Sequence, residues 1–257
     1  MISAMRTSLT VVLGTLVVVT ASLFAQGPAP APAPPSAPAP IPRYEVRRAS
    51  SPVTIDGKLD EPAWGGAPEP VTLQFLWESQ TGAKQKTYAR LLWDAQALYV
   101  GFDAEDADIT AQFLNRDDPT YQDDAVEIFI NPDPKQETVY YGFEMNARGV
   151  LYDYLNYNSR TLFKRWDATG MKIATSIRGT MNVRTDTDAG WSLEASIPWA
   201  NFEELSRRPP AGAVWKVNFN RWDGVQPARR MSIWSDPQNT TSWPHVPSRF
   251  GEIAFAD

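Results

Sequence analysis

Short runs of alternating hydrophobic and polar residues fill most of the chain. In residues 125–130, Val126, Ile128 and Ile130 alternate with an acid and a phenylalanine. A period of two places successive side chains on opposite faces of a β-strand. Runs of this length that are rich in β-branched and aromatic residues predict strands. We expect strands at residues 87–93, 97–102, 125–130, 139–146, 172–177, 191–197 and 214–220.

Turn residues separate these runs, and no long helix is expected. Proline and glycine occur between the runs, as in residues 131–134 and 147–149. Two short helical turns are predicted, one with Asp60 as its N-cap and Pro62 in the first turn, the other near residues 201–205. No internal repeat is apparent. The sequence therefore predicts an all-β fold, a two-sheet antiparallel β-sandwich of jelly-roll type with one or two short helical turns.

The first residues have the pattern of a secretory signal peptide. Arg6 precedes an apolar run over residues 9–21, and Ala25 offers a small residue for cleavage. The apolar run is shorter than the roughly 20 residues that a membrane-spanning helix needs. We predict a signal peptide at residues 1–25, no membrane span after its cleavage, and export to the periplasm, the cell surface or the medium. An uncleaved N-terminal anchor is the alternative.

A linker is predicted at residues 26–43. Proline and alanine occupy 13 of the 16 positions from 27 to 42. Proline fixes its own φ angle and lacks an N–H donor, so neither a helix nor a strand ladder can form there. An extended polyproline spacer follows from this composition. The sandwich domain is predicted to occupy residues 44–257.

Charge and cysteine content narrow the classes of partner. The chain has a net charge of -6 and no cysteine. Nucleic-acid binding needs a basic surface, and no cluster of Lys and Arg occurs, so neither nucleic acid nor an anionic membrane is an expected partner. Without disulfides, an exported domain of this length must be held together by its hydrophobic core.

Several segments together resemble family 9 carbohydrate-binding modules and related DOMON-like β-sandwich domains. They occur in the same order as in the family, over about residues 44–257. The segments are Ile55-Asp-Gly-Lys-Leu-Asp-Glu-Pro-Ala-Trp64, residues 92–102, residues 123–129, Trp191-Ser-Leu-Glu-Ala-Ser-Ile-Pro-Trp199 and residues 246–253. The resemblance implies a β-sandwich with a sugar slot between two aromatic rings, often with bound calcium.

The resemblance also implies candidate sugar-binding residues. Tyr121 matches the first aromatic clamp, where a tryptophan would be the larger platform, and Glu127 matches a glutamate that hydrogen-bonds sugar hydroxyls. The next strand often reads Arg-x-Asn in the family. Here Asn146 is kept and Glu144 replaces the arginine. Because a cationic donor is lost, the family's sugar preference is not carried over to this chain.

The second aromatic clamp has two candidates, Trp234 and Trp243. Trp243 lies in a polar loop and is preferred, because a tryptophan exposed there is not needed for packing of the core and so indicates a binding role. Arg221 ends a predicted strand and could either reach a sugar hydroxyl or pair with an acid such as Asp223. Four other tryptophans are predicted to be core residues, namely Trp64, Trp93, Trp191 and Trp199.

The sequence contains candidate ligands for two cofactors, calcium and haem. The acidic segments 103–108 and 117–124 are candidate ligands for a structural calcium ion, with solvated acidic loops as the alternative. Haem is held by Met and His in some exported electron-transfer sandwiches. It is not expected here, because no Cys-x-x-Cys-His segment occurs. The residues that would be available to haem are Met145, Met171, Met181, Met231 and His245.

The sequence predicts non-catalytic binding of carbohydrate, either mono- or oligosaccharides or the ends of polysaccharides, in support of polysaccharide degradation. A glycoside hydrolase needs two carboxylates that flank the scissile bond. Glu127 and Glu144 are the candidates on neighbouring strands, but neither has a recognisable catalytic context. The alternatives are an exported haem protein and an envelope interaction domain that has lost its sugar site.

Overall fold

Thirteen β-strands make up the domain in the computed structural model, which describes residues 39–158, 161–203 and 211–257. The first seven are β1 (Arg43–Arg48), β2 (Val71–Thr72), β3 (Thr87–Trp93), β4 (Ala97–Ala104), β5 (Ala125–Asn131), β6 (Tyr140–Asn146) and β7 (Leu151–Asn158). The others are β8 (Thr161–Phe163), β9 (Lys172–Arg178), β10 (Gly190–Pro198), β11 (Val214–Asp223), β12 (Arg230–Ile233) and β13 (Gly251–Phe255). One α-helical turn, α1 (Pro62–Gly65), and three 3-10 turns, η1 (Thr120–Gln122), η2 (Trp199–Phe202) and η3 (Pro247–Arg249), complete the described elements. The all-β prediction is confirmed.

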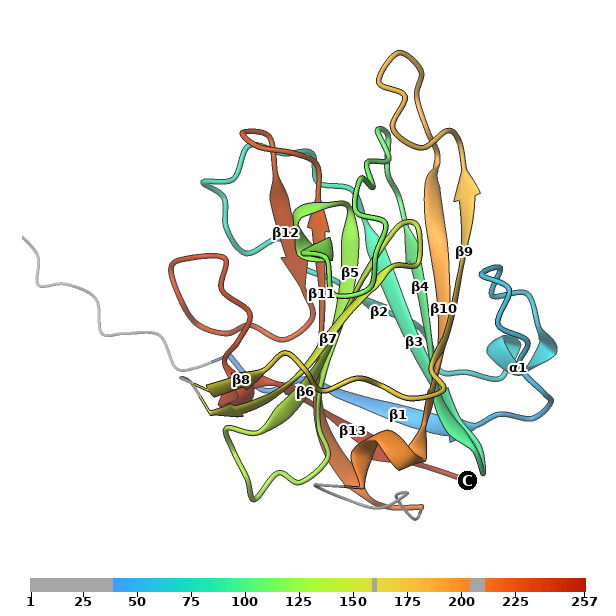
Figure 1. The fold of residues 1–257 in the computed structure, drawn as a ribbon. Coiled ribbons are helices and arrows are strands. Elements are labelled where there is room, and N and C mark those ends of the chain that lie inside the picture. The colour runs from blue at the N-terminus through green and yellow to red at the C-terminus, as the bar shows by residue number, and fades with distance from the viewer. Residues whose placement is uncertain (1–38, 159–160, 204–210) are drawn as a thin grey trace, which may run out of the picture. The chain divides into compact units, whose positions relative to one another are not determined.

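The strands form two layers that are joined by the first strand. One layer has the order β8-β7-β6-β5-β11-β13, with β12 beside β11, and the other has the order β3-β4-β10-β9, with β2 beside β3. The second layer lies at the right of Figure 1, and β5, β11 and β12 lie at the left. The predicted β-sandwich is confirmed, although β1 connects its two sheets into one curled path.

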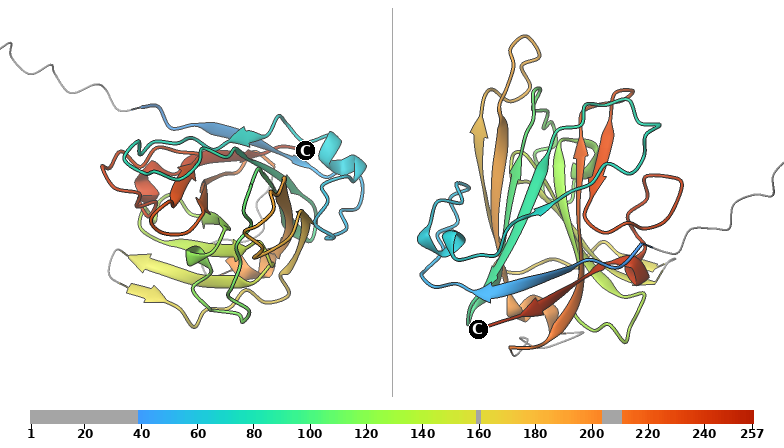
Figure 2. Two further views of the ribbon diagram at one scale, coloured as in Figure 1. Left: turned by 90° about the horizontal axis from the view of Figure 1, so that it is seen from above. Right: turned by 180° about the vertical axis from the view of Figure 1, so that it is seen from behind.

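β1 is also the exception to the predicted antiparallel pairing. Its first residues pair in parallel with β13, from Arg43 opposite Glu252 to Val46 opposite Phe255. Its last two residues, Arg47 and Arg48, pair in parallel with β3. Figure 2 shows β1 running beside β13 in the right-hand view. The chain therefore enters the domain along its own last strand.

The predicted alternation in β5 separates two environments. Val126, Ile128 and Ile130 are fully buried in the main core between the layers. Phe129 belongs to a separate cluster of aromatic residues on the opposite face of the same sheet. The four tryptophans predicted to be core residues are buried: Trp64, Trp93, Trp191 and Trp199. One face of this sheet thus builds the core, and the other is free to build a site.

The structure differs from the predicted elements in several details, and β1, β2, β8 and β12 are strands that were not expected. The turn expected at Asp60 starts at Pro62, with Glu61 as its N-cap. The turn expected near residues 201–205 is η2, which starts two residues earlier. Strand β7 was not predicted, because polar residues interrupt its apolar alternation. Its Asp153 is buried on the core side and accepts hydrogen bonds from Arg116 and the Ala168 backbone N–H, both at 2.6 Å.

The predicted signal peptide at residues 1–25 and most of the predicted linker at 26–43 lie outside the described residues. Within the described ranges, no helix has the length and apolar character needed to cross a membrane.

Candidate functional site

A pocket of about 620 Å³ lies on the outer face of the sheet, over β5, β6 and β7. Residues from η1, the three strands, β8, β11 and the loop that precedes η3 line it. That loop follows β12 and is drawn in orange-red at the left of Figure 1. The pocket wall is more apolar than polar, and seven of its residues carry aromatic rings. Such a concave site with a few polar groups suits a small organic ligand.

Two glutamates lie together in this pocket. Glu127 of β5 and Glu144 of β6 are directly opposite each other in the strand register. Their exposed fractions are only 2% and 3%, and the Oε2 atom of each has no hydrogen-bond partner among the described residues. Burial raises the pKa of Glu127 to about 7. Burial, and then the charge of Glu127, raise the pKa of Glu144 well above its ordinary value.

A glycine makes room for the tyrosine that holds Glu144. Tyr154 of β7 lies opposite Gly142 of β6, and its hydroxyl donates a 2.9 Å hydrogen bond to Glu144 Oε1. A Cβ atom on Gly142 would lie 2.2 Å from the Tyr154 ring. The ring can therefore cross the strand toward Glu144 only because residue 142 has no side chain.

Tyrosine rings form a continuous wall beside the glutamates. The ring of Tyr121 in η1 meets Tyr152 edge-on at 5.8 Å, and Tyr152 lies 5.5 Å from Tyr154. Arg229 donates a hydrogen bond to the backbone carbonyl of Tyr121 and so holds η1 against the sheet. Its guanidinium lies 4.4 Å above the ring of Trp222, which also lines the pocket.

The opposite wall is a loop that carries Trp243 and His245. The His245 ring stacks on Phe129 at 4.8 Å, and its Nδ1 is hydrogen-bonded to the Tyr140 hydroxyl at 2.8 Å. Burial lowers the pKa of His245 to about 4, so the ring is neutral at neutral pH. The ring of Trp243 lies 4.4 Å from that of His245, yet 58% of Trp243 is exposed. The loop is thus anchored while it presents an open aromatic face.

The structure brings four of the seven predicted site residues into this pocket: Tyr121, Glu127, Glu144 and Trp243. The other three do not line it. Asn146 is fully buried, donates to Asp123 Oδ2 at 2.8 Å and accepts from the Val150 backbone N–H at 3.0 Å. Trp234 is a core residue that packs on Phe219 at 5.4 Å. Both Asn146 and Trp234 therefore stabilise the fold and do not line the pocket.

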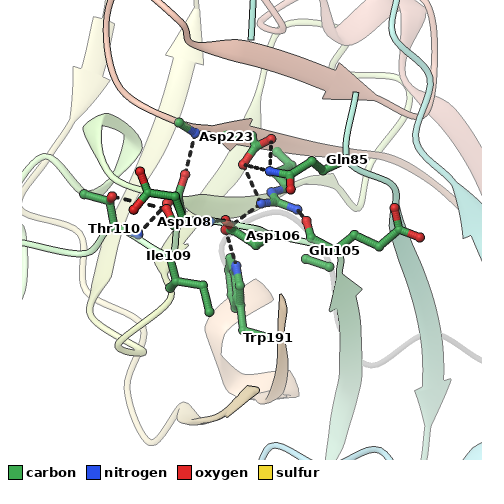
Figure 3. Close-up of polar contacts among 12 residues, drawn as sticks. Gln85, Glu105, Asp106, Asp108, Ile109, Thr110, Trp191 and Asp223 are labelled. Carbon is green, nitrogen blue, oxygen red and sulfur yellow. Dashed lines mark hydrogen bonds and ion pairs between the residues drawn. The ribbon is translucent and has the colours of Figure 1, made fainter. Parts of the chain in front are cut away.

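Arg221, the third, is fully buried in a network of acids away from the pocket. It donates to Asp106 at 2.8 Å and to Asp223 at 2.7 Å, so the predicted pairing with Asp223 is observed. Trp191 donates to the same Asp106 oxygen at 3.1 Å. Figure 3 shows Asp106, Asp223 and Trp191 around this network. Burial raises the pKa of Asp106 to about 6 and that of the neighbouring Asp124 to about 8.

The carboxylates of this network do not fit a calcium site. Asp106, Asp124 and Asp223 are close enough to share a cation. However, the oxygens of Asp124 accept backbone N–H groups of Thr110 and Gly224, and Arg221 already supplies the positive charge. The group formed by Asp117, Asp153 and Asp167 is likewise occupied by a guanidinium, that of Arg116. Calcium binding by the two acidic segments stays a prediction that these contacts do not favour.

The methionines that were considered for haem do not meet the histidine. Met145 and Met231 are fully buried in two other clusters, and neither they nor Met171 nor Met181 line the pocket beside His245.

Several pocket residues were missed by the sequence analysis, among them Tyr140, Tyr152, Tyr154, Lys164 and His245. The alternation of Tyr152 and Tyr154 in β7 was the available signal, since both side chains lie on one face of a strand. No local pattern marks His245, whose partner Tyr140 is 105 positions away.

Comparison with known proteins identifies the fold and its lineage. Residues 55–257 match the family described as carbohydrate family 9 binding domain-like. The chain belongs to this family. The match begins at the Ile55-Asp-Gly segment and includes every element that lines the pocket.

Solved structures similar to this family 9 domain share its fold. A Bacteroides uniformis protein of proposed carbohydrate-binding function is 20% identical, with a TM-score of 0.70 over 84% of this chain and 100% of that one. A family 9 carbohydrate-binding module from Caldicellulosiruptor kristjanssonii in complex with cellotriose is 23% identical, with a TM-score of 0.57 over 83% of this chain and 93% of that one.

One curated relative of the family 9 domain is exoglucanase XynX of Acetivibrio thermocellus, which is 27% identical over 201 residues. The match covers 77% of this chain and 16% of the relative. Endo-1,4-beta-xylanase C of Paenibacillus barcinonensis is 28% identical over 191 residues, which are 73% of this chain and 15% of the xylanase. The chain thus spans less than a fifth of the length of these curated relatives.

Proposed function

We propose that this domain binds carbohydrate in the pocket over β5, β6 and β7, without changing it chemically. The observation that carries the proposal is the joint presence there of open aromatic faces and buried carboxylates. The exposed Trp243 and the half-buried Tyr121 offer apolar surface to the C–H face of a sugar ring, and the buried Tyr152 and Tyr154 line the pocket beside them. Glu127 and Glu144 offer oxygen acceptors to its hydroxyls.

The placement of the two glutamates supports binding rather than hydrolysis. Glycoside hydrolases place two carboxyl groups on either side of the scissile bond. Glu127 and Glu144 are instead neighbours on adjacent strands and rise from the same face of one sheet. A sugar on this face would meet both carboxyl groups from one side.

The relatives support a role beside polysaccharide-degrading enzymes. Two curated relatives are an exoglucanase and an endo-1,4-beta-xylanase, and one solved relative contains cellotriose. Oligosaccharides of glucose and xylose, and the ends of the corresponding polysaccharides, are therefore the first ligands to test. Export of the chain is part of the proposal, since such polymers lie outside the cell.

The test is calorimetric titration with cellobiose and xylobiose, comparing the protein with Trp243→Ala. A ring face that covers about 60 Å² of sugar contributes roughly 1.5 kcal/mol, so the variant should bind about tenfold more weakly. Its melting temperature should be unchanged, because Trp243 is 58% exposed. Truncation of a core tryptophan would instead cost about 3–5 kcal/mol of stability.

The matched control is Tyr157→Ala. Tyr157 is 53% exposed, packs on Phe163 and does not line the pocket, so its loss should leave affinity unchanged. Equal affinity of the protein and Trp243→Ala for every sugar would contradict this site. Failure to bind any sugar would favour an envelope interaction domain without a sugar site.

A further inference from the structure

The glutamate pair in the pocket has no ion-pair partner. Glu127 and Glu144 are at least 97% buried, and no Lys, Arg or His nitrogen of the described residues lies within 4.0 Å of their carboxylates. One oxygen of each also lacks any hydrogen bond from those residues. Burying a carboxylate without a compensating partner is unfavourable, so the free protein retains protons on this pair. A cation from outside the chain would take the place of these protons.

The two nearest basic side chains are directed elsewhere. Arg229 lies over the ring of Trp222 at 4.4 Å and donates to the backbone carbonyls of Tyr121 and Asp123. Lys164 is exposed at the pocket edge, with its Nζ 5.6 Å from the centre of the Tyr152 ring. Their positive charges act on the two glutamates from a distance, but neither side chain forms an ion pair with Glu127 or Glu144.

Other buried acids of the described residues are satisfied from within the chain. Asp106 and Asp223 contact Arg221, and Asp153 contacts Arg116. Glu194, which has the same side chain as the pocket pair, accepts two backbone N–H groups and the Trp64 indole N–H. Among the buried acids of the described residues, the pocket pair is thus the one that keeps carboxylate oxygens without a partner.

We propose that the pocket prefers a sugar that carries a protonated primary amine, an amino sugar of the glucosamine class. This inference rests on the proposed function and specifies its ligand. The ammonium group would lie between Glu127 and Glu144 and donate hydrogen bonds to their free oxygens. The neighbouring tyrosine rings add cation–π attraction, and the rest of the sugar ring stacks on the aromatic walls.

Three sugars that differ at one substituent make the test direct. D-glucosamine, D-glucose and N-acetyl-D-glucosamine are titrated at pH 6.5 and fixed ionic strength, followed by the glucosamine dimer and cellobiose. Charge-assisted hydrogen bonds lead us to expect about tenfold or greater tightening for each amine over its hydroxyl counterpart. The acetamide, which has the same position but no charge, should bind no better than glucose.

Charge-removing variants locate the preference. Glu144→Gln keeps the side-chain shape and an acceptor for Tyr154, so it should reduce the ratio of glucosamine to glucose affinity to near one. Glu127→Gln should reduce this ratio in the same way, and it replaces Glu144→Gln in the test if that variant does not fold. Glu78→Gln is the matched control, since Glu78 is exposed and paired with Lys84 outside the pocket. It should leave the ratio unchanged.

The possible results separate this inference from the proposed function. If glucose or cellobiose binds and the corresponding amine binds no more tightly, the amine preference is overturned while the proposed function stands. An amine preference that persists in both Gln variants would also overturn it. No binding of any of the five sugars would overturn both proposals together.

Discussion

Glu144 determines the character of the candidate site, because it places a second buried acid directly opposite Glu127. An arginine beside Glu127 would form an ion pair, whereas two adjacent acids repel each other as soon as both are ionised. Burial and the charge of Glu127 hold the pKa of Glu144 far above its ordinary value. The folded protein therefore keeps protons on this pair that the unfolded chain has already released.

This difference predicts a pH dependence of stability. A carboxyl group whose pKa is raised by folding stabilises the protein at low pH, and that contribution is lost as pH rises through the folded pKa. Glu127, with a pKa of about 7, ionises between pH 6 and pH 8.5. Tyr154 contacts Glu144, and the charges of Lys164 and Arg229 act on the pair from a distance and lower its pKa values. Glu144→Gln should therefore lose less stability than the unaltered protein between pH 6 and pH 8.5.

Calorimetric melting temperatures across that pH range check this prediction. As pH rises from 6 to 8.5, the melting temperature of the variant relative to that of the unaltered protein should increase by roughly 3 °C or more. Asp106 and Asp124 also have raised pKa values, but they are common to both proteins and cancel in the comparison. Parallel pH profiles would show that Glu144 does not carry the buried proton.

Site residues were predictable where a family pattern marks them and not where distant segments meet. Tyr121, Glu127 and Glu144 follow from the order of residues around two strands, and Trp243 from its polar loop. His245 contacts Phe129 and Tyr140, which are more than 100 positions away. Its role is set by how the loop folds back over the sheet, and no local sequence pattern encodes that path.

At the scale of elements, the contact between β6 and β7 sets the shape of the pocket. Tyr154 crosses over Gly142, and its hydroxyl reaches Glu144 two residues further along β6. Strand β5 was predictable from its clean alternation. Strand β7 was not, since Asp153 faces the core in place of an apolar residue and depends on Arg116 from another part of the chain.

A methyl group at Gly142 should disturb both stability and binding. In Gly142→Ala the new Cβ would overlap the Tyr154 ring, which must then leave its place. We expect a loss of about 1–3 kcal/mol in the free energy of unfolding, together with weaker sugar binding.

Denaturant unfolding and sugar titration measure the two effects. Gly65→Ala is the control, because no atom lies within 4 Å of a Cβ at that position and its φ angle is negative in the α1 turn. If Gly142→Ala were as stable as Gly65→Ala, the glycine would not be needed for the path of Tyr154.

At the scale of the whole domain, β1 is the only described strand that pairs with both layers. It also contributes Tyr44 and Val46 to the main core. The sequence indicated where the domain begins but not that its first strand would run parallel to its last. That pairing joins residues about 210 positions apart, beyond the reach of any periodic pattern.

Two truncations test the importance of β1. A chain that starts at Pro38 retains the compact unit 38–257 and should melt cooperatively. A chain that starts at Ala49 lacks β1, exposes β13 and β3 along their shared edge, and loses two buried side chains. We expect its melting temperature to fall by roughly 10 °C or more. Equal melting of the two chains would show that the layers hold together without β1.

The exposure of Trp243 gives the domain an optical reporter of its own. Of the ten tryptophans in the chain, all lie in the described residues, and Trp243 is the only one exposed. Its emission should therefore lie to the red of the buried indoles and respond to a soluble quencher such as iodide. A ligand that covers the ring would shift this emission toward the blue and shield it from the quencher. Occupancy of the pocket can thus be followed by fluorescence in the unlabelled protein. Trp243→Phe should remove most of the signal, because the other pocket tryptophan, Trp222, is already half-buried.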